Sequence, residues 1–413
     1  MSFIETPPHG QLEAAAQDSL PTLIVGAGIA GTTLAQLLRQ SGQHPVLIER
    51  STGGRHPGYM LALMPMVDRA FDDLGVREAY RARSVPLDRY RVRSHTGRPI
   101  RTESMARLLA RYGDYRGISR GALLDALTTD RAPVSTGTTV THLQEDTDGV
   151  TATLRTGAEE ITARFAVVII ADGIGSTTRD LVATEPPARV DTGWGGWVVW
   201  APPDEEMDLG EELWGTDFMV ATYPVAGAIG VFLGAAREHT QAGPEAFVAR
   251  VRRQVRAPGA RMDAALQAVL DDPDPYYWPL SDVRAARWTT GRTVLLGDAA
   301  AGFLPTAGIG AGMAMESAWM LARMLAHGTR DGGPDIPSLL SSFEVYQRPR
   351  VEAAQDNSRT LARWMFGRSR VWATVRDLAV RLASVTFALG PIRKLLDDLP
   401  DPDAAVRRSA THR

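Results

Sequence analysis

The chain has 413 residues, enough at roughly 150 residues per domain for two or three domains or one large α/β body. It carries 45 basic and 48 acidic side chains, and this net charge of −3 argues against a nucleic-acid-binding protein, which usually has a strong basic excess. The sequence has no cysteine, which excludes disulfides, thiolate nucleophiles and zinc–thiolate sites and fits a cytoplasmic location.

The N-terminal region predicts a short leader followed by a strand–helix–strand unit. Residues 1–19 have no basic start followed by an apolar run, so we expect a loose leader rather than a secretory signal. Residues 23–25 and 46–48 are short apolar runs typical of buried strands, and the apolar residues between Ala30 and Leu38 recur at helical spacing. A parallel unit this short predicts a sheet covered by helices on both faces.

The loop between the first strand and this helix has the pattern G-x-G-x-x-G, in the residues Gly26-Ala27-Gly28-Ile29-Ala30-Gly31. In such a loop Gly26 permits a tight turn, Gly28 lets a pyrophosphate approach the backbone, and Gly31 allows close helix–strand packing. Glu49 ends the second strand, where a carboxylate can accept hydrogen bonds from ribose hydroxyls. The pattern predicts a dinucleotide site and leaves FAD and NAD both open.

A second lobe is predicted from β-type alternation further along the chain. Residues 191–282 are rich in tryptophan, tyrosine and proline and indicate an antiparallel sheet, to which a hairpin at 86–104 contributes. We expect the acidic run at 204–212 to be a solvated loop rather than an acid–base pair.

The remaining segments complete a predicted α/β fold, with a Rossmann-like domain, an inserted antiparallel-sheet domain and C-terminal helices. The dinucleotide domain takes residues 20–190 and 283–334, which are interrupted by the second lobe. Amphipathic helices over 335–396 are expected to pack on the dinucleotide domain, with a dimer contact or membrane-surface binding as alternatives. Residues 397–413 are expected to be a polar tail.

Two more glycine-containing segments follow predicted strands. One begins Ala171-Asp172-Gly173, and the other runs from Gly297 to Gly312. An aspartate at a strand end offers an acceptor for sugar hydroxyls, and a helix start offers unpaired amides to an anion.

Together the three segments resemble those of the class A flavoprotein monooxygenases, the para-hydroxybenzoate hydroxylase family. The resemblance implies FAD as cofactor, NADH or NADPH as a transient co-substrate, and insertion of one oxygen atom from O₂ through a flavin C4a-hydroperoxide. The FAD contacts that it implies are Gly26, Gly28, Ala30, Gly31, Glu49, Arg50, Arg55, Arg120, Val140, Asp172, Gly297, Asp298, Pro305, Gly308, Gly310, Ala311 and Gly312, with Pro305 and Gly310 at the flavin edge.

The chain also departs from the family pattern. Ala301, Gly312 and Ser317 stand where the family has a histidine, an asparagine and an acidic residue. The departures at Ala301 and Gly312 keep open an alternative, a flavoprotein whose FAD is structural and whose pocket templates a non-redox [4+2]-type cyclisation. The related flavin-dependent halogenases need a lysine between flavin and substrate, and the sole lysine here is Lys394, near the C-terminus.

The aromatic second lobe favours a bulky apolar natural product as the substrate for hydroxylation or epoxidation. The candidate pocket residues are Met60, Met64, Trp194, Trp197, Phe218, Tyr223, Trp278 and Phe303. We expect this small molecule and O₂ as partners, and no nucleic acid, metal or integral membrane segment. The substrate, the choice of nicotinamide and the oligomeric state stay open at this point.

Overall fold

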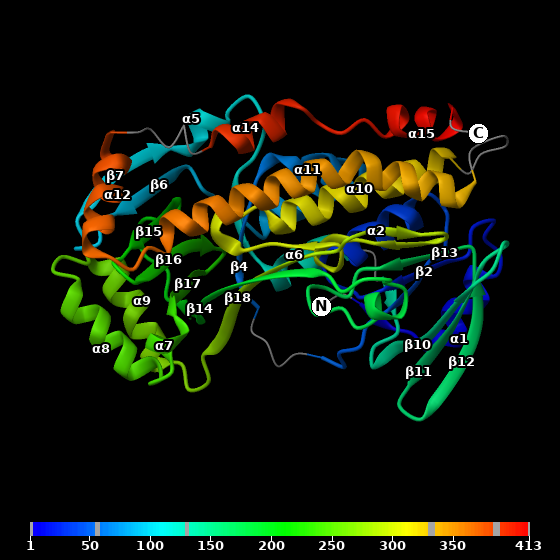
Figure 1. Cartoon of the computed structure of the whole chain (residues 1–413), viewed down its shortest axis with the longest axis horizontal. Coiled ribbons are helices and arrows are strands. Elements are labelled where there is room, and N and C mark those ends of the chain that lie inside the picture. The colour runs from blue at the N-terminus through cyan, green and yellow to red at the C-terminus, as the bar shows by residue number, and fades with distance from the viewer. Residues whose placement is uncertain (1–2, 54–57, 129–131, 329–334, 383–388, 412–413) are drawn as a thin grey trace.

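The computed structural model describes residues 3–53, 58–128, 132–328, 335–382 and 389–411. Figure 1 shows an elongated body in which the N-terminal sheet and its helices occupy one end, a second sheet occupies the other, and the long C-terminal helices cross both. The mixed α/β fold expected from the sequence is confirmed.

The half of the molecule that holds the N-terminal strands, called the N-terminal half below, is built on a five-stranded sheet in the order β19-β20-β13-β2-β3. Its strands are β2 (Thr22–Val25), β3 (Val46–Ile48), β13 (Val167–Ile170), β19 (Thr289–Thr290) and β20 (Thr293–Leu295). The strands β20, β13, β2 and β3 run parallel, and every residue in them is buried. This burial is what a sheet covered on both faces requires, and α2 (Ile29–Gln40) is one of the covering helices.

Smaller elements surround this sheet. Two of them are three-stranded sheets, β10 (Thr138–Glu145) with β11 (Val150–Thr156) and β12 (Glu159–Phe165), and β4 (Met60–Leu63) with β8 (Arg116–Ser119) and β5 (Val85–Pro86). The short helices are α3 (Asp68–Leu74), α4 (Arg77–Ala82), α5 (Met105–Leu109) and α6 (Arg120–Leu127).

The second half is an eight-stranded sheet in the order β21-β18-β14-β17-β16-β15-β6-β7. Its strands are β6 (Arg89–Arg93), β7 (Pro99–Ser104), β14 (Ala188–Ala201), β15 (Leu209–Trp214), β16 (Phe218–Val225), β17 (Ala228–Ala236), β18 (Tyr276–Arg284) and β21 (Ala301–Gly302). The helices α8 (Pro244–Gln254) and α9 (Ala260–Asp271) bury their apolar faces against one side of this sheet, and the short α7 (Arg237–Thr240) precedes them. The other side of the sheet faces the N-terminal half.

Long helices complete the chain: α10 (Gly310–Gly328), α11 (Ile336–Met365), α12 (Arg370–Leu382), α14 (Gly390–Asp397) and α15 (Pro402–Thr411). In Figure 1, α11 runs beside α10 from the N-terminal half to the second sheet, where α12 follows, and α14 and α15 lead back. Within the described ranges, no helix combines the length and apolarity needed to cross a membrane.

The prediction of a loose leader over residues 1–19 is wrong for most of that segment. Residues 8–15 form α1 (Pro8–Ala15), and β1 (Ile4–Glu5) pairs with β9 (Pro133–Val134). The buried Gln11 side chain exchanges hydrogen bonds with the backbone of Leu47, on the edge strand β3. Pro8 does not prevent this helix, because it occupies the first turn, where proline is favoured. The expected tail likewise contains α15, whose Ala405 is buried.

Candidate active site

The three glycines of the first loop have three different surroundings. Gly26 has a φ of +104°, and a Cβ there would lie 2.5 Å from the Ala171 carbonyl oxygen. A Cβ on Gly31 would overlap the Gly26 carbonyl oxygen, so the start of α2 packs directly on the loop. Gly28 has no heavy atom within 4 Å of a Cβ position, which leaves its backbone open to a ligand at the N-terminus of α2.

Acidic side chains accompany this loop. Glu49 accepts hydrogen bonds from the backbone N–H groups of Ala27 (3.0 Å) and Ser51 (2.8 Å), so its carboxylate is held beside the glycine loop. Asp172 Oδ2 accepts one from the Thr178 N–H (3.3 Å), whereas its buried Oδ1 has no partner among the described residues. An unpaired buried oxygen is unfavourable on its own and indicates a place for a ligand donor.

Asp298 follows β20 and opens onto the same space. Its side chain is accessible from the cavity described below, yet protein atoms surround it densely, and this burial raises its pKa from 3.8 to about 6. Beyond it, Gly308 adopts a φ of +63° and α10 begins at Gly310, so the first N–H groups of that helix lack helical partners.

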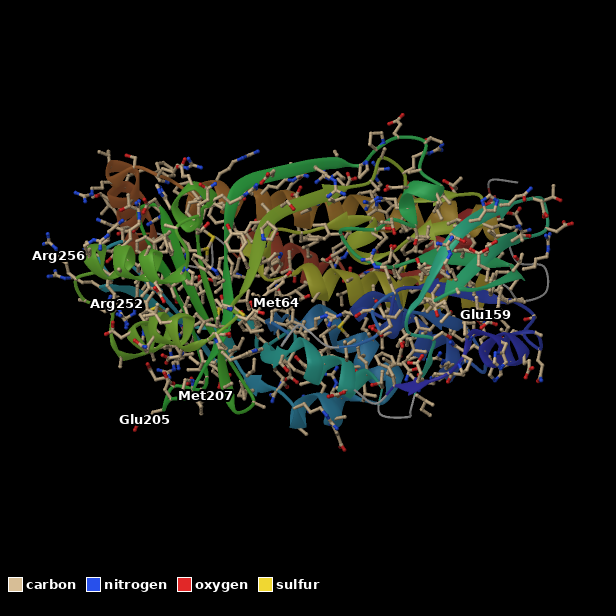
Figure 2. All side chains as sticks on the ribbon, turned by 90° about the horizontal axis from the view of Figure 1, so that it is seen from below. Met64, Glu159, Glu205, Met207, Arg252 and Arg256 are labelled. Carbon is tan, nitrogen blue, oxygen red and sulfur yellow. The ribbon has the colours of Figure 1, made fainter. Side chains whose placement is uncertain are left out.

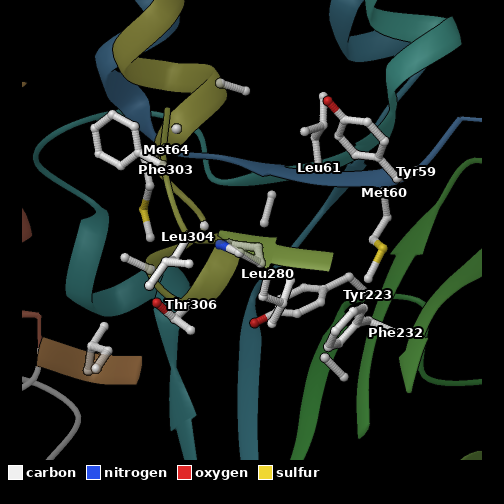
Figure 3. A pocket seen from close by; sticks show the side chains of 18 of the residues that line it. Tyr59, Met60, Leu61, Met64, Tyr223, Phe232, Leu280, Phe303, Leu304 and Thr306 are labelled. Atoms are coloured by element: carbon white, nitrogen blue, oxygen red, sulfur yellow. The ribbon is translucent and has the colours of Figure 1, made fainter. Parts of the chain in front are cut away.

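One cavity of about 880 Å³ joins these features to the second sheet. The predicted residues that line it on the dinucleotide side are Gly28, Ala30, Arg50, Arg120, Asp172, Asp298, Pro305, Gly308, Gly310 and Ala311. Met60, Tyr223 and Trp278 also line it and pack with the core on the cavity face of the second sheet, whereas Met64 and Phe303 line it from the core of the dinucleotide side. Figure 3 shows the Met60 side chain reaching toward Tyr223 and Phe232, with Phe303, Leu304 and Thr306 on a further side of the cavity.

Other predicted cofactor residues lie outside the lining. Gly26, Gly31 and Gly297 mediate close backbone packing, Gly312 packs against the Met66 sulfur, Glu49 lies beside the loop, and Val140 is buried in β10. Arg55 lies outside the described residues. The described side chains also contain no group of three or more histidine and acidic residues that could hold a metal ion.

Three of the predicted pocket residues, Trp194, Trp197 and Phe218, do not line the cavity. Trp197 and Phe218 lie on the opposite face of the sheet, in the core against α8 and α9. Their neighbours Val198 and Met219 line the cavity instead, because successive side chains of a strand alternate between faces. Trp194 is buried by stacking on Phe366, with 4.3 Å between ring centroids.

The sequence prediction missed a polar cluster on the cavity wall. Residues 211 and 212 belong to β15, not to a solvated loop, and both glutamates are buried. Figure 2 shows Glu205, earlier in the same acidic run, projecting outward at the end of the molecule. Glu212 lines the cavity with Tyr90, Tyr115 and Trp214. The sequence offered one signal for this placement: in an alternating strand Leu209 and Leu213 share a face with Glu211, so Glu212 faces the other side.

The C-terminal helices also contribute to the cavity, which was not expected. Leu361 and Met365 of α11, Val380 of α12, and Ile392 of α14 line it together with neighbouring apolar residues. These helices therefore line the cavity in addition to packing on the dinucleotide half.

The dinucleotide side of the cavity fits FAD. The open backbone at Gly28 suits a pyrophosphate, the unpaired Asp172 oxygen and the Asp298 carboxyl suit hydroxyl donors, and the start of α10 suits an electron-rich ring edge. Tyr59 adds a half-buried phenol to the cavity lining, its backbone carbonyl accepts a hydrogen bond from the Arg120 N–H (2.9 Å), and its pKa is raised by desolvation.

Comparisons with known proteins agree with this fit. A family model described as an FAD binding domain matches residues 19–358. The chain is 31% identical to the 3-amino-4-hydroxybenzoate 2-monooxygenase PtnB3 of Streptomyces platensis over 352 residues, 81% of this chain and 86% of that protein. It is 27% identical to the 2-heptyl-3-hydroxy-4(1H)-quinolone synthase of Pseudomonas aeruginosa strain UCBPP-PA14 over 392 residues, 88% of this chain and 94% of that protein.

The fold is also similar to a crystal structure of Klebsiella pneumoniae HpxO complexed with FAD and uric acid. The TM-score is 0.80 at 24% sequence identity, and the match covers 93% of this chain and 98% of that chain. The family match spans most of the sequence, and the structural match shows a shared fold.

Proposed function

This chain belongs to the FAD-binding-domain family and is a class A FAD-dependent monooxygenase, and we propose that it inserts one oxygen atom from O₂ into a bulky, largely apolar aromatic natural product. We assign the reductant as NADH or NADPH. The relatives compared above are named for an aminohydroxybenzoate and a hydroxyquinolone, both of which are aromatic.

The observation that carries this proposal is the continuity of the cavity. Open backbone at Gly28 and the carboxyls of Asp172 and Asp298 lie at one end, and apolar side chains such as Met60 and Phe232 lie at the other. Bound FAD supplies oxygen activation, in which one oxygen atom goes to the substrate and the other leaves as water.

The chain's own residues bind, orient and exclude water. The N-terminus of α10 presents N–H groups and the positive end of a helix dipole to the cavity. A bound group that carries negative charge near Gly308 to Ala311 is stabilised there without a lysine. Apolar residues of β17, α11 and α12 surround the substrate end, and a dry site strengthens these electrostatic interactions.

The cyclase alternative depended on Ala301 and Gly312. Ala301 is buried in β21 and Gly312 packs against Met66, and neither residue lines the cavity. Among the described lining residues, the two positions that motivated the alternative are therefore absent, and the cavity gives the alternative no support.

The test is a combined cofactor and turnover experiment. The purified protein should show a flavin spectrum, and an aromatic substrate should stimulate NADH or NADPH oxidation and take up isotope from labelled O₂. A protein that stays colourless after incubation with FAD, or whose product contains no oxygen from O₂, would contradict the proposal.

A further inference from the structure

Glu212 is a buried carboxylate at the substrate end of the cavity, and its hydrogen-bond donors are all neutral. Its Oε2 accepts hydrogen bonds from Tyr90 Oη (2.8 Å) and Trp214 Nε1 (2.7 Å). Its Oε1 accepts one from Tyr223 Oη (2.6 Å). Glu212 is 7% exposed, and all four residues line the cavity.

The adjacent Glu211 is also buried, but its carboxylate is paired with arginines, and it therefore serves as a comparison for Glu212. Glu211 points to the opposite face of β15 and forms ion pairs with Arg91 (3.1 Å) and Arg93 (2.7 Å). Among the described residues, no ion pair is formed by Glu212. One strand therefore carries one compensated and one uncompensated buried glutamate.

All three donors direct a proton at Glu212. An indole N–H can only donate, so Trp214 requires an acceptor oxygen. Burial raises the pKa values of Tyr90 and Tyr223 well above 10, so both phenols keep their protons and donate them. The two carboxyl oxygens of Glu212 therefore act as acceptors in all three contacts.

This arrangement leaves Glu212 able to bind one more group. A carboxylate has about four lone-pair sites, and three are used here. A buried charge without a counter-ion is unfavourable, and such groups concentrate at functional sites. The described cations that line the cavity are Arg50 and Arg120, both on the dinucleotide side, so a ligand carboxylate would meet no positive charge at Glu212.

We propose that Glu212 determines substrate specificity, by accepting a hydrogen bond from an aromatic N–H or O–H group and by rejecting ligands that present a carboxylate at this end of the chamber. This inference rests on the proposed function, since the chamber must hold the aromatic substrate. The rings of Trp214 and Tyr223 flank the acceptor and suit a flat, apolar ligand body.

The test compares matched ligands on oxidised, FAD-loaded protein by calorimetric titration without nicotinamide. The probes are naphthol with its methyl ether, indole with N-methylindole, and naphthoate. We expect the wild-type protein to bind the N–H or O–H member of each pair about ten-fold more tightly or better, because a hydrogen bond to a charged group is lost on methylation. Glu212→Gln should bring this ratio close to one and improve naphthoate binding.

Tyr223→Phe provides a matched second variant that keeps the charge and frees one lone pair of Glu212. We expect it to preserve or increase the preference for the donor ligand, even if Glu212→Gln fails to fold. A structural role for the cluster would instead lower the melting temperature in both variants and leave the ligand ratio unchanged. Equal binding within the pairs by wild-type protein, no binding of either donor ligand, or a preference that survives in Glu212→Gln would overturn the proposal.

A separate oxygenation assay distinguishes this inference from the proposed function. A ligand preference that depends on Glu212, without incorporation of oxygen, would refute the monooxygenase substrate assignment and leave the recognition role intact. Oxygenation of methylated and unmethylated ligands with equal kcat/KM would refute the role of Glu212 and leave the proposed function intact.

Discussion

The two ends of the cavity are built in different ways. The dinucleotide end is formed mainly by backbone, from glycine turns and the first turns of α2 and α10, together with the Asp172 and Asp298 carboxyls that directly follow strands. The substrate end uses side chains from β4, β6, β15, β16 and β17 and from the C-terminal helices, which are far apart in the sequence. The first end follows from local pattern, whereas the second exists only once the sheet has formed.

This difference predicts how each end responds to substitution. Backbone contacts are insensitive to most side-chain changes but very sensitive to an added Cβ at a close approach. Wall residues change what the chamber binds, and residues one position away on the same strand change only stability, because they face the other core. The following experiments test these distinctions.

The largest effect on stability is expected at Trp197. Its ring packs against Phe247 and Tyr277, with centroids 5.7 and 5.6 Å away, on the face covered by α8 and α9. Trp197→Ala should lower the free energy of unfolding by about 3–5 kcal/mol, the usual range for large-to-small aromatic changes in a core. Denaturant titration measures this loss, and naphthol affinity at low temperature should stay unchanged.

Phe232→Ala is the matched variant on the cavity face of the same sheet. Because one side of this ring already borders the cavity, we expect a smaller loss of stability than at Trp197 and a clear loss of naphthol affinity. If Trp197→Ala impaired ligand binding as strongly as Phe232→Ala, the division of the sheet into a core face and a ligand face would be wrong.

The next largest effect is expected in the glycine loop. An added Cβ on Gly31 would overlap backbone, so Gly31→Ala should lower the free energy of unfolding by about 1–3 kcal/mol and abolish FAD retention. Gly28→Ala meets open space and should leave the FAD-free protein as stable as wild type, while it weakens FAD binding. Melting temperatures without FAD, together with the flavin content after purification, separate the two outcomes.

The same contrast explains how much the sequence could predict. The G-x-G-x-x-G loop, Asp172 and Asp298 follow short, mainly apolar strands, so both their presence and their place at one sheet edge could be inferred. Trp197 and Phe218 could not be placed, because composition identifies an aromatic lobe but only the pairing of β14 with β17 decides which face each ring occupies. Glu212 could not be recognised in the acidic run 204–212, whose first two residues are exposed and whose last four belong to β15.

Asp298 should show a smaller, pH-dependent effect. Its folded-state pKa of about 6 lies above the ordinary 3.8, so proton binding stabilises the FAD-free fold below pH 4, and this contribution is lost as the pH rises through 6. Asp298→Asn should therefore raise the melting temperature of the FAD-free protein above pH 6 and have little effect below pH 4.

Asp298→Asn should lower the affinity for FAD although it raises the melting temperature of the FAD-free protein. Removing a charged acceptor that faces the cavity should weaken FAD binding about ten-fold at pH 7.5, in the range of one hydrogen bond to a charged group. Titration of the FAD-free variant with FAD measures this loss of affinity. An Asn variant that gains stability without losing FAD affinity would place Asp298 outside the cofactor contacts.

The smallest effect is expected at Glu205, which lies in the same acidic run as Glu212 but projects into solvent (Figure 2). Glu205→Gln should change the free energy of unfolding by less than about 0.5 kcal/mol, as for most surface substitutions, and leave the naphthol ratio unaltered. It carries the same chemical change as Glu212→Gln a few residues away. If both variants shifted ligand preference, the effect would come from the summed charge of the run, and the placement of Glu212 on the cavity wall would not be its cause.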